Sequence, residues 1–167
     1  MSNTNNTQWQ ERRALLEKKA KQHEEDLKST MSQTTIDYSK PQTWELHSEL
    51  FPSFEALKEF CDRFPDPSPE LALTKFLTEV RAIADAELAS GKRLQMNWTR
   101  SSYGWKHEAE HYSDRLGKHE YVSNTCFTIA AVKFGFVAKS PKDGTNSINW
   151  YFNFPRNLEK KLGQSRR

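Results

Sequence analysis

Hydrophobic residues recur at spacings of three and four in two stretches of the chain, which is the period of an amphipathic helix. The first stretch follows Pro52-Ser53 and predicts a helix over residues 54–64, which the prolines at 65 and 67 bring to an end. The second follows Ser68-Pro69 and predicts a helix over residues 69–90, with Gly91 as its stop signal.

The pattern after residue 120 predicts a helix followed by a β-hairpin. Ser123 is a favoured N-cap residue and Gly135 can adopt the left-handed conformation that closes a helix, so we expect a helix over residues 124–134. Residues 136–154 then predict a hairpin, because large apolar side chains alternate along its second half and Pro-Lys-Asp-Gly supplies the turn. Alternation also predicts a short strand over residues 94–98, and residues 105–114 are expected to be helical.

These elements predict an α+β, mostly helical fold in a single globular domain over residues 43–155. Residues 1–42 are expected to form an arm and a linker, and residues 156–167 a basic tail. Strong helix formers with opposite charges at helical spacing lie over residues 8–32, and predict either a solvated helix or a docking arm for a protein partner. No run reaches the roughly 18 apolar residues of a membrane span, and the polar N-terminus lacks a signal-peptide core, so we expect a cytoplasmic protein with no membrane contact.

Charge is distributed unevenly along the chain. Residues 1–91 hold 11 Lys and Arg against 16 Asp and Glu, whereas residues 92–167 hold 14 against 6, and the whole chain has a net charge of +3. A basic C-terminal half favours a polyanionic partner, although basic surface residues also serve solubility alone. Cys61 and Cys126 are too few for a disulfide framework and are expected to be buried thiols.

The order of elements over residues 94–154 resembles a winged helix-turn-helix domain. A strand and a helix precede a capped helix that ends in Lys133-Phe134-Gly135-Phe136-Val137, and a hairpin follows. The resemblance implies that the capped helix enters the major groove of DNA and that the hairpin contacts the backbone or the minor groove. Carried onto this sequence, it implies groove-facing side chains at Asn124, Thr125, Thr128 and Lys133, and wing contacts at Lys139 and Lys142.

Aromatic and basic residues also alternate before this helix, where Trp98, Tyr103 and Trp105 interleave with Arg100 and Lys106. Rings beside cations suit single-stranded nucleic acid, in which each stacked base contributes about 1–3 kcal/mol. Burial in the core is the commoner fate of tryptophan, and we expect it for Trp98 and Trp150.

A competing pattern lies at His107-Glu108-Ala109-Glu110-His111, which fits the His-Glu-x-x-His arrangement of zinc hydrolases. Histidines four apart on a helix share one face and can share a zinc ion, with Glu108 as the general base. A third ligand is not obvious, although His119 or Glu120 could serve, and an exposed charged helical face explains the same residues.

The sequence therefore favours a non-enzymatic protein that binds nucleic acid, most simply DNA, and needs no metal or cofactor. The alternatives are a protein-interaction subunit or inhibitor in a nucleoprotein assembly, and a zinc hydrolase. The residues expected to contact nucleic acid are Arg100, Lys106, Asn124, Thr125, Thr128, Lys133, Lys139 and Lys142.

Overall fold

The computed structural model of the chain describes residues 10–19, 21–22, 25, 38, 45–143 and 145–164. The chain divides into two compact units, Met1–Ile36 and Asp37–Arg167. In the first unit, residues 10–19 and 21–22 are helical, as the sequence predicts for the arm over residues 8–32. Arg13 Nε donates to Glu17 Oε1 at 3.1 Å, an exposed pair one helical turn apart. The rest of the arm and most of the expected linker lie outside the described residues.

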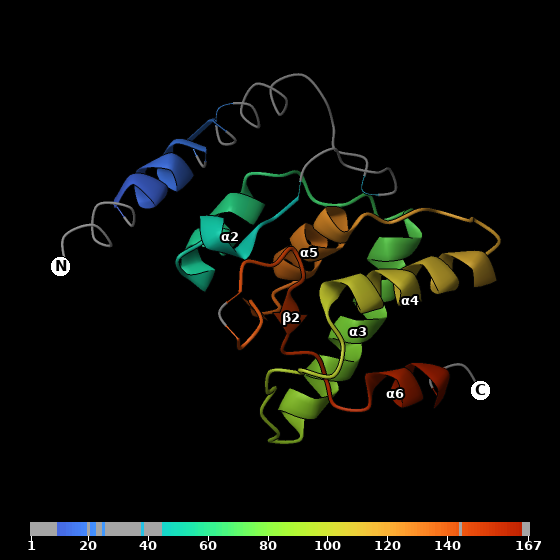
Figure 1. Cartoon of the computed structure of the whole chain (residues 1–167). Coiled ribbons are helices and arrows are strands. Elements are labelled where there is room, and N and C mark those ends of the chain that lie inside the picture. Colours follow the sequence, from blue (N-terminus) through green and yellow to red (C-terminus); the bar gives the residue numbers. More distant parts are fainter. Residues whose placement is uncertain are drawn as a thin grey trace. The chain divides into compact units, whose positions relative to one another are not determined.

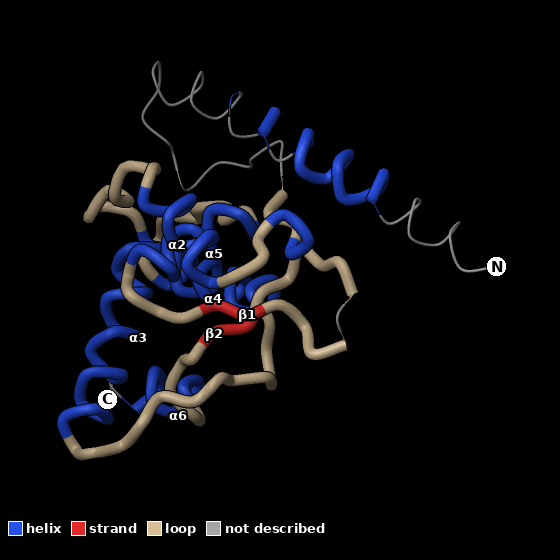
Figure 2. Tube along the Cα trace, turned by 90° about the vertical axis from the view of Figure 1, so that its left-hand side faces the viewer, coloured by secondary structure: helices blue, strands red, loops and turns tan. Residues whose placement is uncertain are grey.

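The second unit is α+β and mostly helical, as expected (Figure 1). Figures 1 and 2 both show the strands of its small sheet between α5 on one side and α6 on the other. Its elements in chain order are η1 (Ser48–Leu50), α2 (Phe54–Asp62), α3 (Ala72–Ala89), α4 (Ser102–Arg115), α5 (Asn124–Lys133), β1 (Ala138–Lys139), β2 (Tyr151–Phe152) and α6 (Leu158–Gln164).

Two helices begin where capping groups place them. Ser53 Oγ accepts a hydrogen bond from Ala56 N at 3.2 Å and opens α2, which ends two residues before the predicted residue 64. α3 begins at Ala72, not at residue 69 as predicted, because the Leu71 N–H donates to Ser68 O at 3.1 Å and closes a separate turn before the helix.

α5 is the central helix of the domain. It begins at Asn124 as predicted, because Ser123 Oγ accepts from Cys126 N at 3.0 Å, and Gly135 follows it with a φ of +84°. Every residue from 125 to 132 is buried, and the helix packs against α2, α3 and α4. A helix surrounded in this way is packed on all sides and has no solvent-exposed face over these residues.

The hairpin is shorter than predicted and has a third neighbour. β1 and β2 are antiparallel, with Ala138 opposite Phe152 and Lys139 opposite Tyr151. Asn97 forms an antiparallel bridge to Phe152 on the other side, so the expected strand over residues 94–98 contributes a single bridging residue. Phe152 stacks on Phe154, with ring centroids 5.0 Å apart, and both rings are fully buried. One face of this small sheet therefore belongs to the core.

The loop between the strands does not project freely as a wing. Ser48 N donates to Ser147 O at 2.8 Å, and Ser147 N donates to Ser48 Oγ at 3.0 Å. Nearby, Trp150 Nε1 donates to Leu46 O at 2.9 Å. These bonds hold the loop and the end of β2 against the segment around η1.

The domain includes a residue that the sequence places in the linker over residues 33–42. Tyr38 is fully buried, and its hydroxyl donates to Pro65 O at 2.5 Å. Burial raises the pKa of the Tyr38 phenol above its ordinary range. A residue packed in this way belongs to the folded unit, which starts at Asp37 by its contacts.

Candidate functional site

Of the three uncharged side chains expected to face a DNA groove from α5, two are buried and one is half-buried. Thr125 and Thr128 are buried, and Thr128 Oγ1 donates back to Asn124 O at 2.9 Å within the helix. Asn124 is half-buried, and its Nδ2 donates to Ile148 O at 2.7 Å, which ties the start of α5 to the hairpin. The expectation that these residues reach base edges is therefore wrong, because packing against the domain occupies the positions that a groove would need.

Three of the expected cationic contacts are engaged by carboxylates. Lys133 Nζ lies 3.1 Å from Asp66 Oδ1, and Lys106 Nζ lies 3.1 Å from Glu110 Oε1. The Arg100 guanidinium contacts the carboxylates of both Glu108 and Glu159, at 2.7 and 2.5 Å, and also lies over the Trp105 ring. Their charges are locally compensated by these carboxylates.

The remaining two, Lys139 and Lys142, are exposed and lie at the outer face of the small sheet. Side chains at paired strand positions point to the same side of a sheet. Lys139 pairs with Tyr151 and Asn97 with Phe152, so Trp98 is the next neighbour of Tyr151 on the outer side. The rings of Trp98 and Tyr151 have centroids 5.2 Å apart, and Lys142 Nζ lies 4.5 Å from the Trp98 ring centroid. We call the surface formed by Trp98, Lys139, Lys142 and Tyr151 the hairpin face.

Sequence reasoning missed two members of this face. Trp98 was expected in the core but is half-buried, whereas Trp105 and Trp150 are buried. The sequence could have placed Tyr151 on the outer face, because it lies between Trp150 and Phe152, which fill the core side of the strand. An aromatic residue on the other side of such an alternation lies on the wet face of the sheet.

One carboxylate lies close to the hairpin face along the chain. Asp143 Oδ1 accepts hydrogen bonds from Thr145 Oγ1 at 2.8 Å and Thr145 N at 3.1 Å. These bonds hold the pKa of the exposed Asp143 carboxyl below its usual range, so it is negatively charged at neutral pH. Among the described residues no carboxylate forms an ion pair with Lys139 or Lys142, and the face keeps a positive balance of two lysines against this one neighbour.

The histidine pattern on α4 does not assemble a metal site in the described residues. His107 Nδ1 lies 2.7 Å from Glu110 Oε2, and Glu108 Oε1 accepts from Arg100. His119 Nδ1 lies 2.9 Å from Asp114 Oδ1. Within the described part of the chain no three His, Cys, Asp or Glu side chains gather closely enough to hold a metal ion.

A second aromatic surface lies on α4 and the residues after it. Tyr103 and Tyr121 are 53% and 49% exposed, and both rings lie about 5 Å from the Lys106 ammonium, at 5.3 and 4.9 Å. Lys106 itself is buried and is paired with Glu110. We call Tyr103, Lys106 and Tyr121 the tyrosine face; its charges cancel, so it is aromatic and close to neutral.

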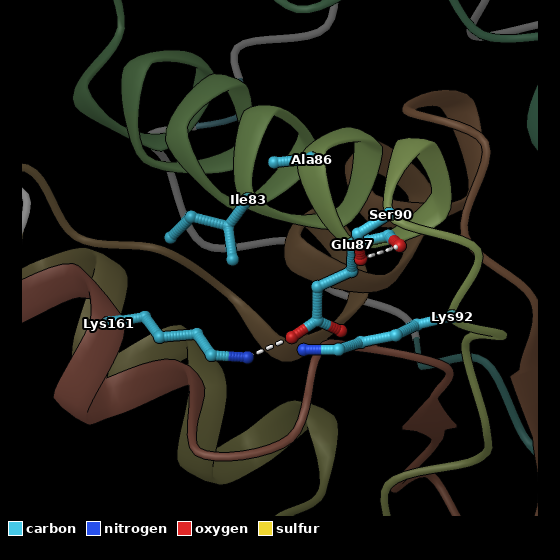
Figure 3. A pocket seen from close by; sticks show the side chains of 6 residues that line it. All are labelled: Ile83, Ala86, Glu87, Ser90, Lys92 and Lys161. Atoms are coloured by element: carbon cyan, nitrogen blue, oxygen red, sulfur yellow. Dashed lines mark hydrogen bonds and ion pairs between the residues drawn. The ribbon is translucent and has the colours of Figure 1, made fainter.

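A shallow hollow of about 320 Å³ lies between α3 and α6 (Figure 3). Lys161 forms an ion pair with Glu87 inside it, and Figure 3 shows Lys92 reaching toward the same carboxylate. The ion pair between Lys161 and Glu87 joins α6 to α3.

Comparison with protein-family models, with curated proteins and with solved structures finds no significant match to this chain. In the described residues, no helix combines the length and the apolar character that crossing a bilayer requires.

Proposed function

We propose that this protein binds nucleic acid through the hairpin face, with Lys139 and Lys142 contacting phosphate groups. The single observation that supports the proposal is the contrast between these two lysines and the other basic candidates. Lys139 and Lys142 are exposed without an ion-pair partner in the described chain, whereas Arg100, Lys106 and Lys133 are neutralised by carboxylates. Free surface cations are the groups that release counterions from a nucleic acid on binding.

In this proposal the hairpin of the winged-helix-like arrangement over residues 94–154 contacts the nucleic acid. The buried helix α5 does not contact it and instead supports the hairpin. Residues 45–164 contain 16 Lys and Arg and 16 Asp and Glu, so the domain has no overall attraction for a polyanion. Binding then depends on the local field of the hairpin face, and a small number of phosphate contacts gives a modest salt dependence.

The proposal is tested by fluorescence anisotropy of the full chain with labelled single-stranded and double-stranded oligonucleotides at ~50 and ~200 mM salt. We expect binding that weakens with salt and that falls in a Lys139→Ala/Lys142→Ala variant, with a salt slope smaller by about 0.7–0.9 for each lost phosphate contact. Lys75→Ala, which removes an exposed lysine from α3, is the matched control and should bind like the wild type. No binding to any of the oligonucleotides at the lower salt concentration would refute the proposal.

A second candidate function is protein–protein interaction through the tyrosine face. Exposed tyrosines held rigidly by a shared cation have the composition of interface hot spots, which are rich in Tyr and poor in free charge. A partner captured by the wild type but lost from a Tyr103→Ala/Tyr121→Ala variant, and retained by the hairpin-face variant, would favour this candidate.

A further inference from the structure

We infer that the nucleic acid bound at the hairpin face is single-stranded, and that its unpaired bases stack on Trp98 and Tyr151. The inference rests on the proposed function and names the class of ligand. It starts from the arrangement of the two rings, which lie side by side on neighbouring backbone segments with an interplanar angle of 46°. Both residues are half-buried, so each keeps part of its surface accessible to solvent.

The shape of the face argues against a duplex. Reading a groove of B-DNA requires a projecting helix or a two-stranded ribbon that fits inside the groove. In the described part of the loop between β1 and β2, Ser48 ties Ser147 to the domain through two hydrogen bonds. α5, the other element expected to enter a groove, is buried from residue 125 to residue 132. The hairpin face instead offers side chains from paired backbone segments, on which unpaired bases could stack.

The charges around the rings fit a strand whose bases are unstacked from each other. Lys139 is opposite Tyr151 in the strand register, and the Lys142 ammonium lies over the Trp98 ring, so each aromatic residue has a lysine as its neighbour on this face. In single-strand binding, aromatic rings take the bases and nearby cations take the phosphates that join them. Two aromatic residues with a lysine neighbour each would serve two nucleotides of a single strand.

Lys142 has to move for this to occur. Its ammonium covers the Trp98 ring at 4.5 Å in the free protein, in the position that a base would take. An exposed cation–π contact is weaker than the stacking of a base on an aromatic ring, and the released ammonium gains a phosphate partner. A bound single strand therefore displaces the Lys142 ammonium from the Trp98 ring.

The test compares a labelled thymidine oligonucleotide of about 12 nucleotides with a duplex of the same length, using the full chain. We expect the single strand to bind at least about tenfold more tightly than the duplex. Trp98→Ala and Tyr151→Ala should each weaken single-strand binding by about 5- to 150-fold, while Trp98→Phe, which keeps a ring, loses less. Tyr121→Ala removes an exposed tyrosine that lies outside the hairpin face and should leave the affinity unchanged.

Tryptophan fluorescence provides a second measurement that does not depend on how the alanine variants fold. Binding of the oligonucleotide should quench part of the emission of the wild type, and that part should be missing in Trp98→Phe. Equal or tighter binding of the duplex, together with no effect of Trp98→Phe on quenching, would overturn the inference and leave the proposed function standing. Absence of binding to both oligonucleotides would overturn the two together.

Discussion

The carboxylate of Glu120 caps α3 by accepting a hydrogen bond from the backbone N–H of Ala72 at 2.7 Å. Leu71 occupies the N-cap position of this helix and offers no side-chain acceptor. A residue that follows α4 thus satisfies a donor at the start of α3, and its negative charge lies at the positive end of the helix dipole.

Glu120→Ala should therefore lower the free energy of unfolding by about 1–2 kcal/mol, the usual cost of losing an N-cap acceptor. Glu120→Gln keeps an acceptor but loses the charge, and should cost less, about 0.5 kcal/mol. Urea denaturation measures both variants, with the exposed Glu45→Ala as control. Equal losses in the free energy of unfolding for the two Glu120 variants would show that the capping hydrogen bond is not the source of the stabilisation.

Gly104 should resist substitution by alanine although it lies inside α4. A Cβ added there would overlap Arg100 Cγ and lie 2.9 Å from Arg100 Cδ, so the arginine would have to leave its contacts with Glu108 and Glu159. We expect Gly104→Ala to destabilise the domain by about 1 kcal/mol in total, because the loss of the Arg100 contacts outweighs the gain in helix propensity. That gain is about 0.5–1 kcal/mol for alanine in place of glycine.

The same substitution in an Arg100→Ala background should instead stabilise the protein, because only the propensity gain remains. Thermal unfolding of the four variants completes the cycle. If Gly104→Ala has the same effect in both backgrounds, the close approach of Arg100 is not the reason for the glycine.

Glu110 should make stability depend on acid pH. Burial favours the protonated carboxyl, but hydrogen bonds from Val122 N–H, Lys106 and His107 outweigh it and hold the pKa of Glu110 below 4.5, the value for an unperturbed glutamate. A lowered pKa in the folded state stabilises the protein above the unfolded pKa, and this contribution is lost as pH falls through the folded pKa.

Glu110→Gln should accordingly cost about 2–4 kcal/mol near neutral pH, since it also leaves Lys106 buried without its charged partner. The difference from the wild type should shrink as the pH is lowered below 4.5. Denaturation curves across this pH range measure the effect, with the exposed Glu55→Gln as a control that should show little change. A difference that stays constant with pH would contradict the assignment.

Neither cysteine should react readily in the folded protein. Cys61 and Cys126 are both fully buried, and burial raises the pKa of the Cys61 thiol to about 12, so the reactive thiolate is scarce at physiological pH. A colorimetric thiol reagent should react slowly with the native chain and rapidly after unfolding in urea. Fast reaction of one thiol without denaturant would show that a cysteine is accessible.

Local signals in the sequence were sufficient to place the ends of α5. Ser123 supplies the cap and Gly135 the left-handed stop, and both interactions are made within a few residues of the helix. The orientation of the helix could not be obtained in the same way. Thr125 and Thr128 count as polar in a pattern, but a threonine hydroxyl can bond to the preceding turn of its own helix and be buried without penalty, as Thr128 is.

Whether a basic side chain is paired with a carboxylate depends on residues that are distant in the sequence. Arg100 meets Glu159, and Lys133 meets Asp66, pairings that no spacing rule for a single helix or strand predicts. Trp98 was misplaced for a similar reason, because its exposure follows from the bridge between Asn97 and Phe152. Sequence patterns thus predicted the helices α2 to α5 and a hairpin that is shorter than expected, but not η1 or the helix α6 in the expected tail, and the surface charges depended on tertiary contacts.

The bonds between the η1 segment and the hairpin join positions about a hundred residues apart, 99 for Ser147 with Ser48 and 104 for Trp150 with Leu46. Closing so long a loop is entropically costly and is a feature of slowly folding topologies. On the ribosome, the segment near Leu46 leaves the exit tunnel long before its partner has been made. The domain consequently completes its packing only late in synthesis, and a chain truncated before Trp150 cannot close the hairpin side of its core.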